Sequence, residues 1–169
     1  FTMDVYIDGS SLTGTQINKV QFKLQDKSMG GSAWQSQVVS EVLIDAVDTW
    51  QTVEFDFIAA SGRTDIDQVV IQFNGENNND QVIAYIDNLV SSTSPEPDPC
   101  DGVTGAPAIA DDFDGNSVDI LEYAGDNDAT YATVDGSPFG STSNVLQYVD
   151  NGGQYANIQL RTCNKFDMA

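Results

Sequence analysis

The feature that most restricts the fold of this chain is an alternation of apolar and polar residues that returns in short segments. In residues 19–25, Val20, Phe22 and Leu24 alternate with polar residues, and residues 51–57 show the same pattern. A period of two places the apolar side chains on one face of an extended strand, whereas a helix needs a spacing of three or four. Each segment therefore predicts a strand with one face in a core and one in solvent.

Clusters of turn-forming residues separate these segments. Glycine, asparagine and aspartate gather in residues 29–32, 74–80 and 150–153, and helical spacing is hard to find. The other predicted strands are residues 1–7, 34–39, 67–73, 82–89, 131–134, 144–149 and 155–160. Many short strands joined by such turns predict an all-β fold, an antiparallel β-sandwich of the jelly-roll type.

A proline-rich stretch interrupts the strand pattern. Residues 94–108 hold four of the five prolines of the chain, with acidic residues between them, and this composition predicts an extended linker. We interpret residues 1–93 as the C-terminal part of one sandwich module. Residues 109–169 are then the N-terminal part of the following module, or of the same module closed in a circular order. The pattern is the one expected of a window cut from a tandem repeat.

The chain is strongly acidic, with 26 Asp and Glu residues, six Lys and Arg residues and a formal net charge of −20. This charge repels phosphate backbones and anionic lipid headgroups, so neither nucleic acid nor a membrane surface is an expected partner. No apolar run approaches the roughly 18 residues of a membrane-spanning helix. No membrane insertion is therefore expected.

Histidine is absent from the chain. Without it there is no Ser-His-Asp triad, no imidazole metal ligand and no general base of the usual neutral-pH kind. A glycosidase needs only two carboxylates in a groove, but no acidic motif set among aromatic residues nominates such a pair. We therefore predict that the chain is not an enzyme.

The two cysteines are Cys100, in the predicted linker, and Cys163, near the end of the last predicted strand. An even number of cysteines permits a disulfide without requiring one. We expect this bond, which would attach the linker to a strand end and would persist only in an oxidising compartment. An extracellular or cell-surface location follows from that expectation.

Candidate ligand-binding residues combine an aromatic ring with amide side chains. Trp34 follows a glycine-rich turn and precedes Gln35 and Gln37, while Gln72 belongs to a polar stripe on the predicted strands. The rest of that stripe is Gln21, Lys23, Gln25, Gln68 and Asn74. An aromatic platform beside planar amides is what carbohydrate recognition requires. The alternatives are a solvated sheet face for the stripe and a core position for Trp34.

Three segments carry a resemblance to a known family: Asp112-Phe113-Asp114-Gly115, residues 50–57 and Tyr85-Ile86-Asp87-Asn88-Leu89. Once the two parts of the chain are reordered, they resemble the jelly-roll carbohydrate-binding modules of secreted bacterial glycosidases and large bacterial surface adhesins. The resemblance implies a structural calcium ion where the opening and closing strands lie side by side. On this chain its ligands would be Asp87, Asp112 and Asp114, unless these carboxylates only accept hydrogen bonds from local backbone donors.

Taken together, these features predict a non-catalytic extracellular β-sandwich repeat of a bacterial surface adhesin or fibre, which links modules and binds glycan. Its partners would be neighbouring copies of the same module, in tandem or by strand exchange, and polysaccharide. The alternative is an accessory carbohydrate-binding module of a secreted polysaccharide-degrading enzyme. The fold would be the same in both cases, and a catalytic neighbour would distinguish them.

Overall fold

The computed structural model describes residues 1–91, 109–115, 117, 120–166 and 168, and for residues 163 and 164 it describes the backbone only. The predicted linker, residues 94–108, lies outside the described residues. The strands are β1 (Thr2–Ile7), β2 (Lys19–Gln25), β3 (Val38–Leu43), β4 (Gln51–Glu54), β5 (Ile66–Phe73), β6 (Gln81–Val90), β7 (Ala110–Asp111), β8 (Ile120–Asp126), β9 (Ala129–Asp135), β10 (Asn144–Asn151) and β11 (Asn157–Phe166). Four 3₁₀ segments complete the described elements: η1 (Gly9–Ser11), η2 (Lys27–Ser36), η3 (Ile58–Ala60) and η4 (Ser137–Phe139).

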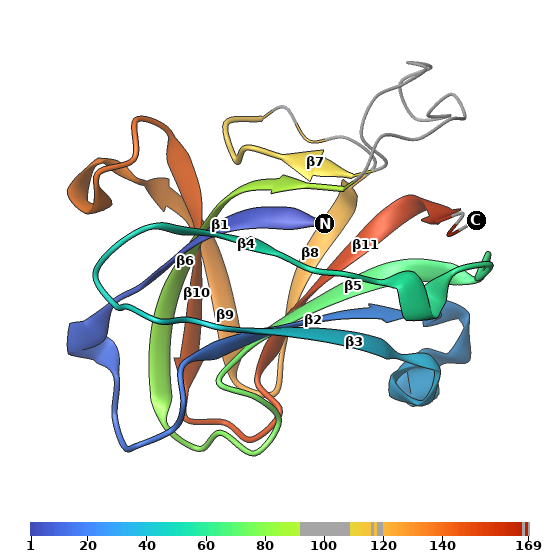
Figure 1. Cartoon of the computed structure of the whole chain (residues 1–169), viewed down its shortest axis with the longest axis horizontal. Helices are drawn as coiled ribbons and strands as arrows, with labels where there is room; N and C mark the ends of the chain where they lie inside the picture. Colours follow the sequence, from blue (N-terminus) through green and yellow to red (C-terminus); the bar gives the residue numbers. More distant parts are fainter. Residues whose placement is uncertain (92–108, 116, 118–119, 167, 169) are drawn as a thin grey trace.

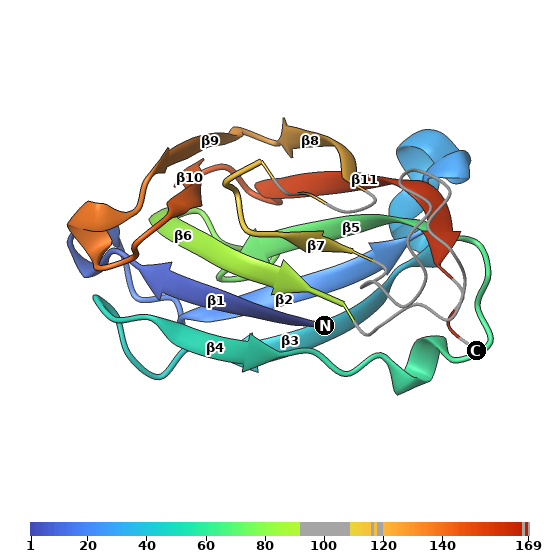
Figure 2. The same ribbon diagram turned by 90° about the horizontal axis from the view of Figure 1, so that it is seen from above.

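The strands form two antiparallel sheets that pack face to face (Figure 1, Figure 2). The first sheet has the order β4-β1-β6-β10-β9, with β7 beside one end of β6, and the second has the order β3-β2-β5-β11-β8. The predicted all-β antiparallel sandwich is therefore confirmed. Within the described residues, no helix has the length and apolarity needed to cross a membrane.

The core lies between the two sheets and is filled by the inward positions of the alternating segments. Fully buried side chains include Met3, Val5, Ile7, Val20, Phe22, Leu24, Val69, Ile71, Phe73, Ala84, Ile86, Ile158 and Leu160. Burying each large aliphatic or aromatic side chain contributes about 1.5–3 kcal/mol. Because the inward face of β2 is fixed by this burial, its intervening polar residues must point away from the core.

Both long segments of the chain contribute strands to both sheets. In the first sheet Ile86 of β6 lies opposite Leu146 of β10, and in the second Val69 of β5 lies opposite Leu160 of β11. The described parts of residues 1–93 and 109–169 therefore build one sandwich within this chain.

The residues on either side of the undescribed stretch meet. The Ser91 amide donates to the Ile109 carbonyl at 2.8 Å, and the Ile109 amide donates to Ser91 Oγ at 2.7 Å. Near the ends of the chain, the rings of Phe1 and Phe166 lie 5.9 Å apart.

One predicted strand was placed too early. Residues 34–36 belong to the 3₁₀ segment η2, and the strand begins only at Val38. Gly30 has a φ of 58°, a backbone conformation that residues with a side chain rarely adopt, and it produces a kink inside η2. The segment therefore projects from the sheet edge, and it carries Trp34 with it.

Candidate ligand-binding groove

The outer face of the second sheet holds a groove with a volume of about 820 Å³. Its floor consists of outward-facing side chains of β2, β5 and β11, and its walls come from η2 and from the turns around Asn127 and Tyr155. The lining residues are Lys23, Gln25, Lys27, Gly30, Gly31, Ala33, Trp34, Gln37, Gln68, Val70, Gln72, Glu76, Gly125, Asp126, Asn127, Tyr155, Asn157 and Gln159. Amides dominate this floor because the strand alternation turns the apolar residues inward.

Strand register brings the amides of the floor together. Gln25 of β2 lies opposite Gln68 of β5, and Val70 lies opposite Gln159 of β11. Gln68 Nε2 donates to Gln25 Oε1 at 2.9 Å, and Gln25 Nε2 donates to Gln37 Oε1 at 3.1 Å. This chain of hydrogen bonds fixes the orientation of three amide planes in a nearly dry environment, where such bonds reinforce one another.

An ion pair lies beside the amide chain. The Lys23 side chain is 5% exposed, and its Nζ donates to Gln72 Oε1 at 2.7 Å and to Glu76 Oε1 at 2.6 Å. The hydrogen bond from Lys23 holds the pKa of the Glu76 carboxyl below its usual range. Because a buried ammonium is costly unless it is paired, Glu76 allows Lys23 to remain charged at the floor of the groove.

Two amide oxygens in the groove have no hydrogen-bond partner among the described residues. They are Gln68 Oε1 and Asn157 Oδ1, on residues that are 1% and 8% exposed. Gln21 Oε1, outside the groove on the same face of the sheet, also has no partner among the described residues. A buried acceptor without a partner costs about 1–3 kcal/mol. Both groove oxygens are enclosed by neighbouring side chains, so a donor in the groove reaches them only after those side chains move.

Exposed aromatic rings stand at the rim of the groove. Trp34 is 61% exposed and Tyr155 is 48% exposed, although both have large apolar surfaces. Tyr155 has a φ of 67°, and its amide donates to the Glu76 carbonyl at 3.1 Å. A non-glycine residue in this region costs on the order of 1 kcal/mol and is held only where its surroundings require it.

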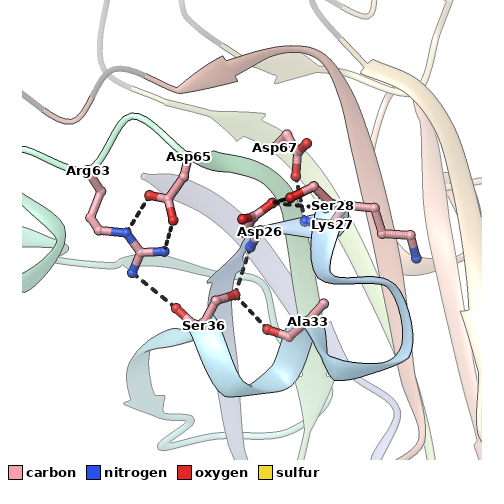
Figure 3. Close-up of polar contacts among 8 residues, drawn as sticks. All are labelled: Asp26, Lys27, Ser28, Ala33, Ser36, Arg63, Asp65 and Asp67. Carbon is pink, nitrogen blue, oxygen red and sulfur yellow. Dashed lines mark hydrogen bonds and ion pairs between the residues drawn. The ribbon is translucent and has the colours of Figure 1, made fainter.

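The segment that carries Trp34 is anchored by polar contacts (Figure 3). The Asp26 amide donates to Ser36 Oγ at 2.8 Å, and the Lys27 amide donates to Asp67 Oδ1 at 2.7 Å. Arg63 Nη1 donates to the Ser36 carbonyl at 3.1 Å. The start of η2 is thus joined to β5, its two ends are joined to each other, and its last residue is joined to Arg63. The backbone that carries Trp34 is therefore ordered before any ligand arrives, which lowers the entropy cost of binding.

Three of the four predicted ligand-binding residues line the groove: Trp34, Gln37 and Gln72. Gln35 is exposed and does not line it, because neighbouring residues of a 3₁₀ turn point in different directions. Sequence reasoning did not select Tyr155. The available signal was a large aromatic residue two positions after the glycine-containing turn at residues 150–153.

The predicted calcium ligands Asp87 and Asp114 both contact the segment that leads into β10. Asp87 Oδ2 accepts hydrogen bonds from Ser141 Oγ at 3.2 Å and Ser143 Oγ at 3.3 Å. Asp114 Oδ1 accepts from the Asn144 amide at 3.0 Å. Burial raises the pKa of the Asp87 carboxyl above its ordinary value.

Asp112, the third predicted ligand, accepts a hydrogen bond from the Asp114 amide at 3.0 Å. Across the part of the chain that is described, no three acidic or sulfur-bearing side chains lie together in a way that could hold a metal ion. Calcium binding therefore stays a prediction. The predicted disulfide falls outside the description, because Cys100 and the Cys163 side chain are not described.

Comparisons with models of protein families, with curated proteins and with solved structures find no match. The chemistry of the groove is therefore the guide to function. It offers two exposed aromatic rings, a floor of oriented amides, two lysines and two carboxylates. This set suits a flat, hydroxyl-rich molecule with apolar faces.

Proposed function

We propose that this chain is a non-catalytic extracellular module of the jelly-roll type that binds polysaccharide in the groove of its second sheet. The observation that carries the proposal is the combination of exposed Trp34 and Tyr155 with a floor of oriented amide side chains between them. Sugar rings have apolar C–H faces that stack on aromatic rings. Their hydroxyl groups donate to amide oxygens.

The length of the floor favours an oligosaccharide segment over a single sugar. Gln68 and Gln72 are four residues apart on β5, a distance of about 13 Å at a strand rise of about 3.3 Å per residue. Trp34 follows the end of β2 that pairs with Gln68, whereas Tyr155 precedes the end of β11 that pairs near Ile71. The two aromatic residues therefore belong to opposite ends of the floor.

Titration calorimetry against a panel of soluble polysaccharides tests the proposal. Trp34→Ala and Tyr155→Ala should each weaken binding by about tenfold, equal to about 1.4 kcal/mol. The matched control is Tyr131→Ala on β9 of the other sheet, where Tyr131 is 40% exposed; it should bind as the wild-type chain does. The proposal fails if no polysaccharide binds, or if both groove variants keep wild-type affinity while folded by circular dichroism.

We place the module in a bacterial surface adhesin or fibre, where neighbouring copies would be its partners in tandem or by strand exchange. The alternative setting is a secreted polysaccharide-degrading enzyme, in which the module would hold the substrate for a catalytic neighbour. The groove serves either setting. The sequence of the complete gene distinguishes them, because an array contains further copies of the module and an enzyme contains a catalytic domain.

Catalysis by the module itself is not proposed, since Glu76 is committed to the ion pair with Lys23. Release of reducing ends from a bound polysaccharide would contradict this part of the proposal. A structural calcium ion near Asp87, Asp112 and Asp114 is proposed from the family resemblance alone. Chelation should then lower the melting temperature, and an unchanged melting temperature would exclude the ion.

A further inference from the structure

The two lysines of the groove differ in how fully their ammonium groups are used. Lys23 makes two hydrogen bonds of 2.7 and 2.6 Å, one of them in an ion pair. Lys27 Nζ donates to Gln159 Oε1 at 3.4 Å, a distance longer than the usual 2.7–3.2 Å. An ammonium group has three donors, so the Lys27 head group retains capacity for another partner at the edge of the groove.

The carboxylates around Lys27 are used by other groups. Asp126, which also lines the groove, accepts a hydrogen bond from Gln159 Nε2 at 3.2 Å. Asp26 Oδ1 accepts from the Ser28 amide at 2.9 Å and from Ser28 Oγ, and the Ser28 hydroxyl lowers the pKa of the Asp26 carboxyl. Asp67 Oδ1 accepts from the backbone amide of Lys27 itself. Figure 3 shows the Lys27 side chain extending away from this cluster. The neighbouring carboxylates therefore stabilise the backbone of η2 and leave the ammonium group to the groove.

An unpaired lysine is unexpected in a chain with 26 acidic and six basic residues. Four of the six basic side chains do form ion pairs, as Lys19–Glu41, Lys23–Glu76, Arg63–Asp65 and Arg161–Glu122. Lys27 and Lys165 form no ion pair with any carboxylate of the described residues. Of these two lysines, only Lys27 lines the groove, and its position there points to an anionic partner that is part of the ligand.

The charge of the groove limits how anionic that ligand can be. Lys23 and Lys27 balance Glu76 and Asp126, so the groove lining is formally neutral, whereas the whole chain has a formal charge of −20. Screening reduces interactions beyond about 8 Å at physiological ionic strength. A single carboxylate beside Lys27 is therefore attracted, but a chain with a carboxylate on every sugar would also meet the acidic surface outside the groove.

We propose that the groove selects a polysaccharide with isolated carboxylates on an otherwise neutral chain, and that Lys27 pairs with one such carboxylate. This inference depends on the proposed function, because it names the class of glycan that the groove takes. The carboxylate completes the hydrogen bonding of the Lys27 ammonium group. The neutral sugars on either side stack on the aromatic rings and form hydrogen bonds with the half-buried amides of Gln37 and Gln159.

The test uses glucuronoxylan and xanthan, each in its native form and after chemical reduction of its uronate carboxylates to alcohols. The wild-type chain should bind at least one native polysaccharide about tenfold more tightly than the reduced form, and added salt should diminish this preference. Lys27→Gln should abolish the preference. Lys19→Gln is the matched control, because Lys19 is paired with Glu41 and does not line the groove; it should retain the preference.

Three results would overturn the inference: equal binding of the native and reduced forms, an undiminished preference in Lys27→Gln, or tightest binding to polygalacturonate, which has a carboxylate on every residue. If reduced or neutral polysaccharides bind through Trp34 and Tyr155 without any such preference, the inference fails and the proposed function stands. If no polysaccharide of either panel binds, both fail.

Discussion

The two outer faces of the sandwich both have aromatic residues, but in opposite arrangements. On the first sheet, the rings of Tyr85 and Phe139 stack at 3.8 Å, and Tyr6 lies 5.6 Å from both Phe139 and Trp50. Trp50 Nε1 donates to the Phe139 carbonyl at 2.9 Å. These aromatic residues cover one another, and the face is closed by its own side chains.

On the second sheet the aromatic residues stay apart and the polar groups are incompletely paired. Trp34 and Tyr155 are exposed at the rim of the groove, and the amides of Gln68 and Asn157 each keep an oxygen without a partner among the described residues. Aromatic content alone therefore does not mark a binding face. Exposed rings without aromatic neighbours, above a floor of amides, are the arrangement on which the proposed binding face depends.

The largest expected difference between the faces is in stability. Trp50→Ala should lower the free energy of unfolding by about 2–3 kcal/mol, slightly less than the cost at a fully buried tryptophan, because Trp50 is half-buried. Trp34→Ala should change it by less than about 0.5 kcal/mol, as at other exposed positions. Denaturant unfolding of both variants measures the contrast. Equal losses would mean that Trp34 is a packing residue and not a platform.

A smaller contrast is expected between two amides, one on each face. Gln68→Met breaks the hydrogen bond that orients Gln25, and through it Gln37, and should weaken polysaccharide binding about fivefold, the value of one hydrogen bond of about 1 kcal/mol. Gln147→Met is the matched control on the first sheet, where Gln147 Nε2 donates to the Tyr85 hydroxyl at 3.3 Å. Calorimetric titration measures the polysaccharide affinity of both variants. A comparable loss of affinity in Gln147→Met would contradict binding in the groove.

The sequence predicted the faces of the strands better than it predicted their neighbours. The alternation of Val20, Phe22 and Leu24 determines which side of β2 meets the core, and so it also predicts the polar stripe that includes Lys23 and Gln25. The register that places Gln25 opposite Gln68 depends on packing between segments over 40 residues apart. No local pattern contains that information.

Residues of the groove walls were harder to predict because they lie outside the strands. The strand pattern of residues 155–160 suggests that Tyr155 begins a strand, but β11 starts at Asn157 and Tyr155 stands in the preceding turn. Its positive φ is set by the contact with Glu76 from another turn. The exposure of Trp34 could be predicted from the sequence, because Gly30 and Gly31 precede it and indicate a turn that leaves the sheet.

The smallest expected effect is a pH dependence of opposite sign on the two faces. In the groove, the hydrogen bond from Lys23 lowers the pKa of the Glu76 carboxyl in the folded chain. The ionised carboxylate therefore stabilises the fold at any pH above the ordinary glutamate pKa of about 4.3. This stabilisation is lost as the pH falls through the lowered pKa of the folded chain. On the first sheet, burial raises the pKa of Asp87. Its charged form is disfavoured by folding at neutral pH, and protonation relieves this penalty as pH falls through the raised value.

Unfolding free energies at pH 7 and pH 4 of the wild-type chain, Glu76→Gln and Asp87→Asn measure these two contributions. The advantage of the wild-type chain over Glu76→Gln should shrink at pH 4, by less than about 1 kcal/mol because Glu76 is partly exposed. Relative to Asp87→Asn, the wild-type chain should gain stability at pH 4. A loss of stability at pH 4 in both comparisons would show that Asp87 is stabilised as a carboxylate, as a bound cation would make it.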